Sequence, residues 1–198
     1  MDATLFAAFI AVAIPAFFTP GPNNLMLMAS GAKFGFGRTI PHGLGVSIGF
    51  ALMVVVIGLG LGEVFEALPW LKTALKVVAA IYLLYLAWSL LGLKIDDEAT
   101  ANDRPMTFLQ AAAFQWVNPK AWAMAVSFVA LVVDPGPGRL IGIALLGLGC
   151  LLLGPFSSAL WMGFGDRLQI FLKRTGGERF LGIVLAVLVV ASVVLFLL

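Results

Sequence analysis

The sequence predicts an all-α membrane protein with six transmembrane helices. Of its 198 residues, 62% are hydrophobic and only 11% are charged, and the mean hydropathy is +1.07. Soluble globular domains carry about 25% charged residues, so this composition is typical of a protein embedded in a lipid bilayer. The apolar residues gather in six stretches long enough for helices to cross a hydrocarbon core of ~30 Å.

The first span is expected over residues 5–32, and its centre carries a run of residues that breaks helices. Proline lacks a backbone N–H, and its ring clashes with the carbonyl group four residues earlier. The two prolines of the run therefore leave the carbonyl groups of Ala16 and Phe18 without helical partners. Irregular backbone survives at membrane depth only inside protein or beside water, so the run should point inward. The run reads Phe17-Phe18-Thr19-Pro20-Gly21-Pro22-Asn23-Asn24.

Beyond this break a helix should restart with Pro22 near its first position. Proline suits that position because a backbone N–H there would be unpaired in any case. The N–H groups of Asn23, Asn24 and Leu25 should then be uncommitted and form the positive end of the helix dipole.

The other spans of the first half follow from the positions of prolines and charged residues. Lys33 and Arg38 bound a short turn, Pro41 opens a second span that ends near Gly62, and a third span covers residues 69–93. The longest polar stretch, residues 94–104, contains four acidic residues and divides the chain near its middle. We therefore expect a first three-helix repeat over residues 1–93 and a polar linker over residues 94–107.

The second half, residues 108–198, should contain three further spans, over residues 108–133, 140–163 and 180–198. The first of these is also broken, at Asn118-Pro119-Lys120. Pro119 frees the carbonyl group of Gln115, and Asn118 is a natural N-cap for a helix that restarts. Because each half crosses the membrane an odd number of times, the second half enters from the opposite side. The sequence thus predicts two inverted three-helix repeats, with the first helix of each repeat broken.

Paired breaks at corresponding places in two halves indicate the central site of a secondary transporter. A lone proline, such as Pro15 or Pro155, more often only kinks a transmembrane helix. Two matched breaks favour the transporter interpretation over two unrelated kinks.

The chemistry of the breaks suits an amino acid, which carries a carboxylate and an ammonium group. Restarted helix N-termini present N–H donors to a carboxylate, and stranded carbonyl groups accept from an ammonium group. The asparagine amides suit either end of the zwitterion, although capping of the restarted helices explains them equally well. The predicted substrate-binding residues are Thr19, Pro20, Gly21, Pro22, Asn23, Asn24, Asn118, Pro119 and Lys120.

Lys120 is the charged residue set deepest in a predicted span, and it has no acidic partner at that depth. A lysine at the centre of a span costs about 2.5–3.5 kcal/mol on insertion scales, so it normally faces a cavity or a counter-charge. A substrate carboxylate would be such a counter-charge. The alternative is that the ammonium group bonds to freed backbone carbonyl groups or reaches the membrane edge.

Three other features carry weaker predictions. His42 is expected at the mouth of the second span, where a structural role is favoured over proton transfer. The pairs Gly45-x-x-x-Gly49 and Gly58-x-x-x-Gly62 permit close helix approach, within the subunit more than between subunits. Cys150, the single cysteine, excludes an internal disulfide and is expected to serve packing.

The chain resembles the lysine exporter and homoserine/threonine efflux (LysE/RhtB) family of amino-acid exporters. The most specific match is Thr19-Pro20-Gly21-Pro22-Asn23 followed about 100 residues later by Asn118-Pro119-Lys120 in a six-span chain. The resemblance implies six helices and export of small amino acids or close derivatives across a bacterial inner membrane. The chain departs from a frequent family pattern because Gly49-Phe50-Ala51-Leu52 in the second span contains no acidic residue.

Orientation is predicted from the lysine and arginine residues between the spans. With the N-terminus outside, the inner segments contain eight of these residues and the outer segments contain three, namely Lys72, Lys76 and Arg139. An excess of this size favours two periplasmic termini and a cytoplasmic 94–107 linker. The inner residues are Lys33, Arg38, Lys94, Arg104, Arg167, Lys173, Arg174 and Arg179.

The composition also ranks the other function classes. The net charge of +2 is spread over short loops, so nucleic acid is not an expected partner. No nucleotide-binding motif occurs and no cofactor is expected, so ion or voltage gradients should drive transport.

An exporter of another small solute, such as a metal cation, is the alternative, but the spans lack clustered metal ligands. An intramembrane enzyme is least favoured because a serine nucleophile needs a base, and His42 is the single histidine. The sequence also permits a homo-oligomer.

Overall fold

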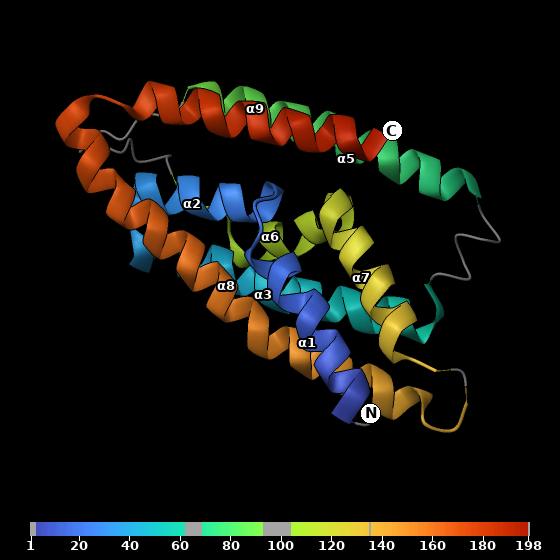
Figure 1. Ribbon diagram of the computed structural model, residues 1–198. Coiled ribbons are helices and arrows are strands. Elements are labelled where there is room, and N and C mark those ends of the chain that lie inside the picture. The colour runs from blue at the N-terminus through green and yellow to red at the C-terminus, as the bar shows by residue number, and fades with distance from the viewer. Residues whose placement is uncertain (1–2, 62–68, 93–103, 135, 198) are drawn as a thin grey trace.

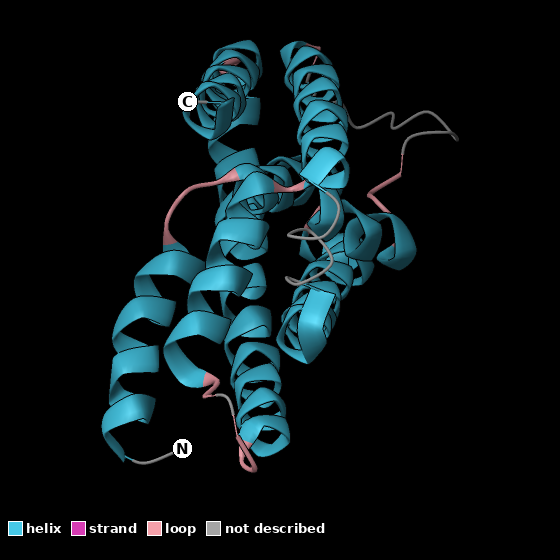
Figure 2. Cartoon of the chain, turned by 90° about the vertical axis from the view of Figure 1, so that its right-hand side faces the viewer, coloured by secondary structure: helices cyan, strands magenta, loops and turns pink. Residues whose placement is uncertain are grey.

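The computed structural model describes residues 3–61, 69–92, 104–134 and 136–197, and the secondary structure in these ranges is helical (Figures 1 and 2). Most of the predicted linker, residues 94–103, lies outside the described residues, as does Gly62. The first part of the chain forms α1 (Ala3–Phe18), α2 (Pro22–Phe34), α3 (Phe36–Val56), the π-helical turn η1 (Ile57–Leu61) and α5 (Pro69–Leu91). The second part forms α6 (Phe108–Phe114), the 3₁₀ turn η2 (Gln115–Val117), α7 (Pro119–Val132), α8 (Arg139–Thr175) and α9 (Glu178–Leu197).

Both predicted helix breaks are confirmed. The first separates α1 from α2, whose axes are bent by 47°, and α2 restarts with Pro22 in its first turn. At the second, α6 tightens into the 3₁₀ turn η2, and Asn118 is extended before α7 restarts at Pro119. In both places a proline opens the new helix, as its fixed φ and missing N–H favour.

The described helices include several that suit a membrane. Phe36–Gly60 and Arg139–Leu172 are long and apolar enough to cross one, and the bent pair α1 and α2 makes a third candidate. Shorter apolar helices cover Val77–Leu91, Pro119–Val132 and Arg179–Val194. The predicted helical architecture is therefore confirmed for the described residues, and its long apolar helices are consistent with a membrane protein. The six spans, the inverted repeat and the division at residues 94–107 stay predictions.

Two helix boundaries differ from the predicted spans. Helix α3 begins at Phe36 instead of Pro41, after Gly35 turns the chain at φ 81°, and the Phe36 N–H donates to an Asp166 carboxylate oxygen at 3.0 Å. Helix α8 does not end near Gly163 but continues to Thr175, because its polar residues are compatible with a helix and a left-handed glycine, Gly176, comes only then.

Small residues let the helices of the bundle approach closely. The long helix α8 runs diagonally across α2 and α3, and α5 and α9 lie side by side (Figure 1). Gly31 of α2 and Gly165 of α8 face backbone atoms of the opposite helix. Gly45 and Gly49 face α6, so the predicted close approach within the subunit is confirmed for this pair.

We expect Gly165→Ala to lower the thermal stability of the purified protein. A methyl group at Gly165 would collide with the backbone carbonyl of Met28, which cannot rotate away as a side chain would. Overpacking of this kind costs about 1–3 kcal/mol, which corresponds to a fall in Tm of roughly 2–12 °C. Gly37→Ala is the matched control because a Cβ atom there meets nothing within 4 Å. Equal Tm values for the two variants would contradict the close contact.

Candidate functional site

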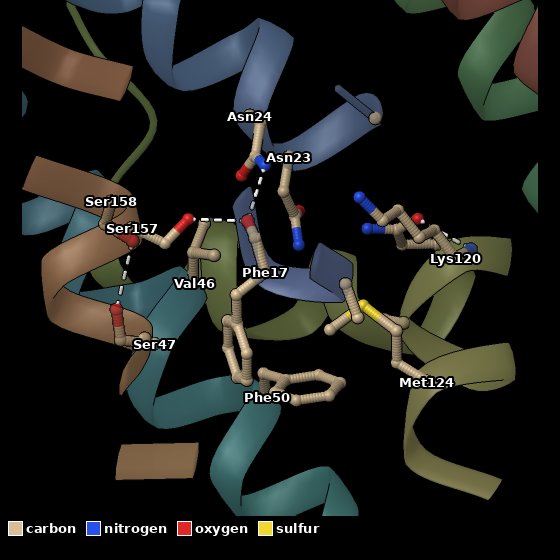
Figure 3. A pocket seen from close by; sticks show the side chains of 15 residues that line it. Phe17, Asn23, Asn24, Val46, Ser47, Phe50, Lys120, Met124, Ser157 and Ser158 are labelled. Carbon is tan, nitrogen blue, oxygen red and sulfur yellow. Dashed lines mark hydrogen bonds between the residues drawn. The ribbon is translucent and has the colours of Figure 1, made fainter. Parts of the chain in front are cut away.

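A pocket lies between the two helix breaks, with walls from α1, α2, α3, α7 and α8 (Figure 3). It holds about 430 Å³ of empty space, counting its open mouth. Phe17 and Phe50 pack edge to face at its apolar end, with ring centroids 5.4 Å apart. The lining residues are Ala16, Phe17, Gly21, Asn23, Asn24, Val46, Ser47, Phe50, Asn118, Lys120, Ala121, Met124, Gly154, Ser157 and Ser158.

Two carbonyl groups next to the first break, those of Phe17 and Thr19, are paired with side chains of the pocket, whereas the predicted free carbonyl of Ala16 accepts only the Thr19 hydroxyl at 3.5 Å among the described residues. The Phe17 carbonyl accepts from Asn24 Nδ2 at 2.9 Å and from Ser157 Oγ at 2.7 Å. The Thr19 carbonyl accepts from Asn24 Nδ2 at 2.8 Å and from Lys120 Nζ at 2.8 Å. A carbonyl oxygen has two lone pairs, so both groups are fully used by the protein.

Lys120 connects the two breaks. Its ammonium group, on the restarted helix α7, donates to the Thr19 carbonyl at 2.8 Å, to the Thr19 hydroxyl at 2.9 Å and to the Pro20 carbonyl at 3.4 Å. Bonding to backbone carbonyl groups is the alternative that the sequence left open for this ammonium group, and oxygens of the other break take that place. Gly21 makes room for this side chain, since a Cβ there would lie 2.6 Å from Lys120 Cδ.

A second link between the breaks is a reciprocal amide pair. Asn23 Nδ2 donates to Gln115 Oε1 at 2.8 Å, and Gln115 Nε2 donates to Asn23 Oδ1 at 3.2 Å. Gln115 is fully buried and also donates to the Ala111 carbonyl at 2.9 Å. The sequence drew attention to the backbone carbonyl of Gln115 but not to its side chain.

Asn118 caps α7, as the sequence predicted. Its Oδ1 accepts from the Lys120 N–H at 3.1 Å, and its own N–H donates to the Gln115 carbonyl at 3.3 Å. The Lys120 N–H and the Gln115 carbonyl, which were expected to be free for a substrate, therefore both form hydrogen bonds with Asn118. No described residue accepts from the side-chain amide nitrogen of Asn118, which lines the pocket.

The restart of α2 matches the prediction only in part. Leu25 N–H donates to the Gly21 carbonyl at 2.9 Å, so the expectation that it is uncommitted is wrong. This bond is the first one of the helix, which forms once Gly21 becomes the N-cap. The N–H groups of Asn23 and Asn24 precede that first bond and have no partner within the helix.

The predicted site residues divide between the pocket and its surroundings. Gly21, Asn23, Asn24, Asn118 and Lys120 line the pocket. Thr19, Pro20, Pro22 and Pro119 do not, and they shape the breaks.

The prediction that the whole first run points inward is wrong for two of its residues. Thr19 and Pro20 are exposed, while the run is buried again at Gly21 and Pro22. Thr19 and Pro20 lie at the 47° bend, on the surface of the described chain. The Lys120 ammonium group donates to both of their carbonyl oxygens, and the Asn24 amide group donates to that of Thr19.

Sequence reasoning missed three serines of the pocket. Ser157 and Ser158 lie on α8 and Ser47 on α3, and all three are buried. The signals that would have found them are a pair of hydroxyl residues just beyond Pro155 in an apolar stretch, and a serine between Gly45 and Gly49.

His42 is 2% exposed within α3, so its predicted place at the mouth of a span is wrong. The reason is that α3 begins at Phe36 and carries His42 into the packed bundle. Its Nδ1 has no hydrogen-bond partner among the described residues. Within the same residues, no group of three or more His, Cys, Asp or Glu side chains could hold a metal ion.

Comparisons with known proteins identify the family. The family profile described as "LysE type translocator" matches residues 14–198. A cysteine/O-acetylserine efflux protein of Salmonella choleraesuis (strain SC-B67) is 30% identical over 194 residues, covering 96% of each chain. The protein of the same name from Escherichia coli (strain K12) is 29% identical over 195 residues, again covering 96% of each chain. No solved structure matches this chain. The chain therefore belongs to the family of LysE type translocators.

Proposed function

We propose that this protein is a secondary transporter that exports small neutral amino acids or close derivatives across the bacterial inner membrane. The observation that carries the proposal is the pocket between the two helix breaks. Among the described residues, its lining contains one cation, Lys120, several neutral polar groups and no carboxylate. The similar proteins from Salmonella choleraesuis and Escherichia coli are named as efflux proteins for cysteine and O-acetylserine, which are small amino acids.

The carboxylate end of the substrate would bind at the second break. Asn118 and Lys120, two residues apart at the start of α7, both line the pocket. The longest of the three Lys120 bonds, 3.4 Å to the Pro20 carbonyl, is the one a carboxylate would replace at least cost. The N-terminal end of α7 adds a favourable dipole there.

The rest of the pocket favours a small side chain without positive charge. Val46, Phe50 and Met124 supply apolar walls, which suit thiol, methyl or short acyl groups. In the part of the chain that the structure describes, no acidic residue lines the pocket, so the ammonium group of a lysine-like side chain would lose its hydration without a counter-charge from these residues.

The fold proposed for transport has six spans in two inverted repeats, over residues 1–93 and 108–198, with the 94–107 linker in the cytoplasm. We expect a cysteine introduced into this linker to resist a membrane-impermeant thiol reagent in intact cells and to react after the cells are opened. The native Cys150 is buried and would be replaced by alanine as background. Rapid labelling of the linker in intact cells would contradict this orientation and place the linker in the periplasm.

The test of function is resistance and efflux in cells with and without the gene, challenged with a panel of toxic amino acids and analogues. We expect resistance to small neutral compounds, accompanied by faster efflux of the same compound from preloaded cells. Unchanged sensitivity to every amino acid, with the protein present in the membrane, would contradict the proposed function.

A further inference from the structure

We propose that the ammonium group of the substrate binds an acceptor cluster formed by Asn24, Ser157 and Ser158, on the side of the pocket away from Lys120 (Figure 3). This inference rests on the proposed function. It replaces the sequence-based expectation that the stranded carbonyl groups of the breaks hold the ammonium group.

The two hydroxyl groups of the cluster already donate their protons in hydrogen bonds within the protein. Ser47 donates to the Gly43 carbonyl at 2.9 Å, so in its 3.1 Å contact with Ser158 the donor must be Ser158. Ser157 donates to the Phe17 carbonyl at 2.7 Å. A hydroxyl group has one proton and two lone pairs, so Ser157 and Ser158 can offer only acceptors to a ligand.

The same count applies to Asn24. Its two amide protons go to the carbonyl groups of Phe17 and Thr19, at 2.9 and 2.8 Å. Only the carbonyl oxygen, Oδ1, is left for a ligand. Asn24 and Ser157 bond to the same Phe17 oxygen, which holds their side chains close together.

The carbonyl groups at the breaks are poorer candidates for the ammonium group. Those of Phe17 and Thr19 each accept two hydrogen bonds from the protein. Of the three predicted to be stranded, that of Ala16 accepts the Thr19 hydroxyl at 3.5 Å, that of Gln115 accepts the Asn118 N–H, and Phe18 is not among the residues that line the pocket. Apart from the contact between Ser47 and Ser158, no hydrogen bond from a described residue to the side-chain oxygens of the acceptor cluster is present. Its three members are between 3% and 8% exposed, so bonds to an ammonium group would form away from bulk water.

The pocket is therefore polarised between donors and acceptors. Lys120 lies on the α7 side, where Asn118 is the N-cap, whereas the acceptor cluster lies on the α2 and α8 side (Figure 3). An ammonium group has three N–H donors and matches the three acceptors. A zwitterion would enter this pocket in one orientation, with its side chain toward Phe50 and Met124.

The experiment uses efflux of labelled L-cysteine from proteoliposomes, inhibited by L-alanine or by 3-mercaptopropionate, which lacks the ammonium group. In the wild-type protein we expect L-alanine to inhibit at least about tenfold better than 3-mercaptopropionate, a difference of about 1.4 kcal/mol. Ser157→Ala should weaken inhibition by L-alanine about tenfold or more and leave inhibition by 3-mercaptopropionate unchanged. Ser157→Thr keeps the hydroxyl group and should restore most of the difference.

Ser158→Ala provides a second measurement because Ser158 makes no bond to the first break. It should likewise lower the preference for L-alanine over 3-mercaptopropionate. Equal weakening of both inhibitors in both alanine variants would overturn the ammonium assignment and leave the serines a structural role. Weaker cysteine transport with unchanged inhibition by L-alanine would also overturn it, since the cluster would then bind the thiol. A wild-type protein that transports neither L-cysteine nor L-alanine would contradict the proposed function itself.

Discussion

Replacing Lys120 by methionine is expected to reduce amino-acid efflux by roughly 10- to 100-fold while leaving membrane insertion intact. Methionine keeps much of the length of the side chain and removes its charge. A hydrogen bond to a charged group contributes about 1.5–3 kcal/mol, which sets the size of the loss. The measurement is efflux from preloaded vesicles, normalised to the amount of protein in the membrane.

The comparison of an amino acid with its neutral amide separates two roles of Lys120. If the ammonium group binds the substrate carboxylate, Lys120→Met should impair efflux of the acid more than that of the amide. If the ammonium group only holds the breaks together through the Thr19 and Pro20 oxygens, Lys120→Met should impair efflux of both compounds equally. Lys120→Arg should rescue poorly because a broad guanidinium group does not fit where Gly21 packs on the lysine stem. Lys33→Met controls for loss of a charge outside the pocket.

The double substitution Pro20→Ala and Pro22→Ala is expected to abolish efflux. Without the prolines the helix can continue from α1 into α2 and recapture its own carbonyl groups. The Phe17 and Thr19 oxygens would then leave Ser157, Asn24 and Lys120, and the pocket would lose its shape.

Pro15→Ala is the matched control for this substitution. Pro15 lies inside α1 and is exposed, so its replacement should at most straighten that helix. Efflux at the wild-type rate in the double variant, with the protein correctly inserted, would contradict a site built on the first break.

The sequence predicted the breaks well because proline acts locally. A missing N–H and a clash with the carbonyl group four residues earlier follow from the residue itself, whatever packs around it. The same is true of the cap at Asn118, whose side chain bonds two residues ahead. Five of the nine proposed site residues line the pocket between these breaks, and their role in binding substrate stays a prediction.

The partners across the pocket depend on packing between distant segments, which a single sequence does not display. Ser157 reaches the Phe17 carbonyl over 140 positions, and Asn23 meets Gln115 over 92. Lys120 illustrates the point, because the sequence left open whether its ammonium group meets a substrate carboxylate or backbone carbonyl groups, and it did not show that the Thr19 and Pro20 oxygens of the other break lie within reach. The burial of His42 was missed for a related reason, since it depends on where α3 begins.

The most direct test of the account is protection of the pocket by substrate. A single cysteine at Met124, which lines the pocket, would be introduced into a Cys150→Ala background of the purified protein, with Gly138→Cys in the turn before α8 as control. The rate of modification by a thiol reagent would be measured against rising concentrations of O-acetylserine and L-alanine. We predict that at least one of these amino acids slows modification at position 124 in a saturable manner and leaves position 138 unaffected. Unchanged rates at position 124, in a protein that still exports the same compounds, would contradict a substrate site between the two breaks.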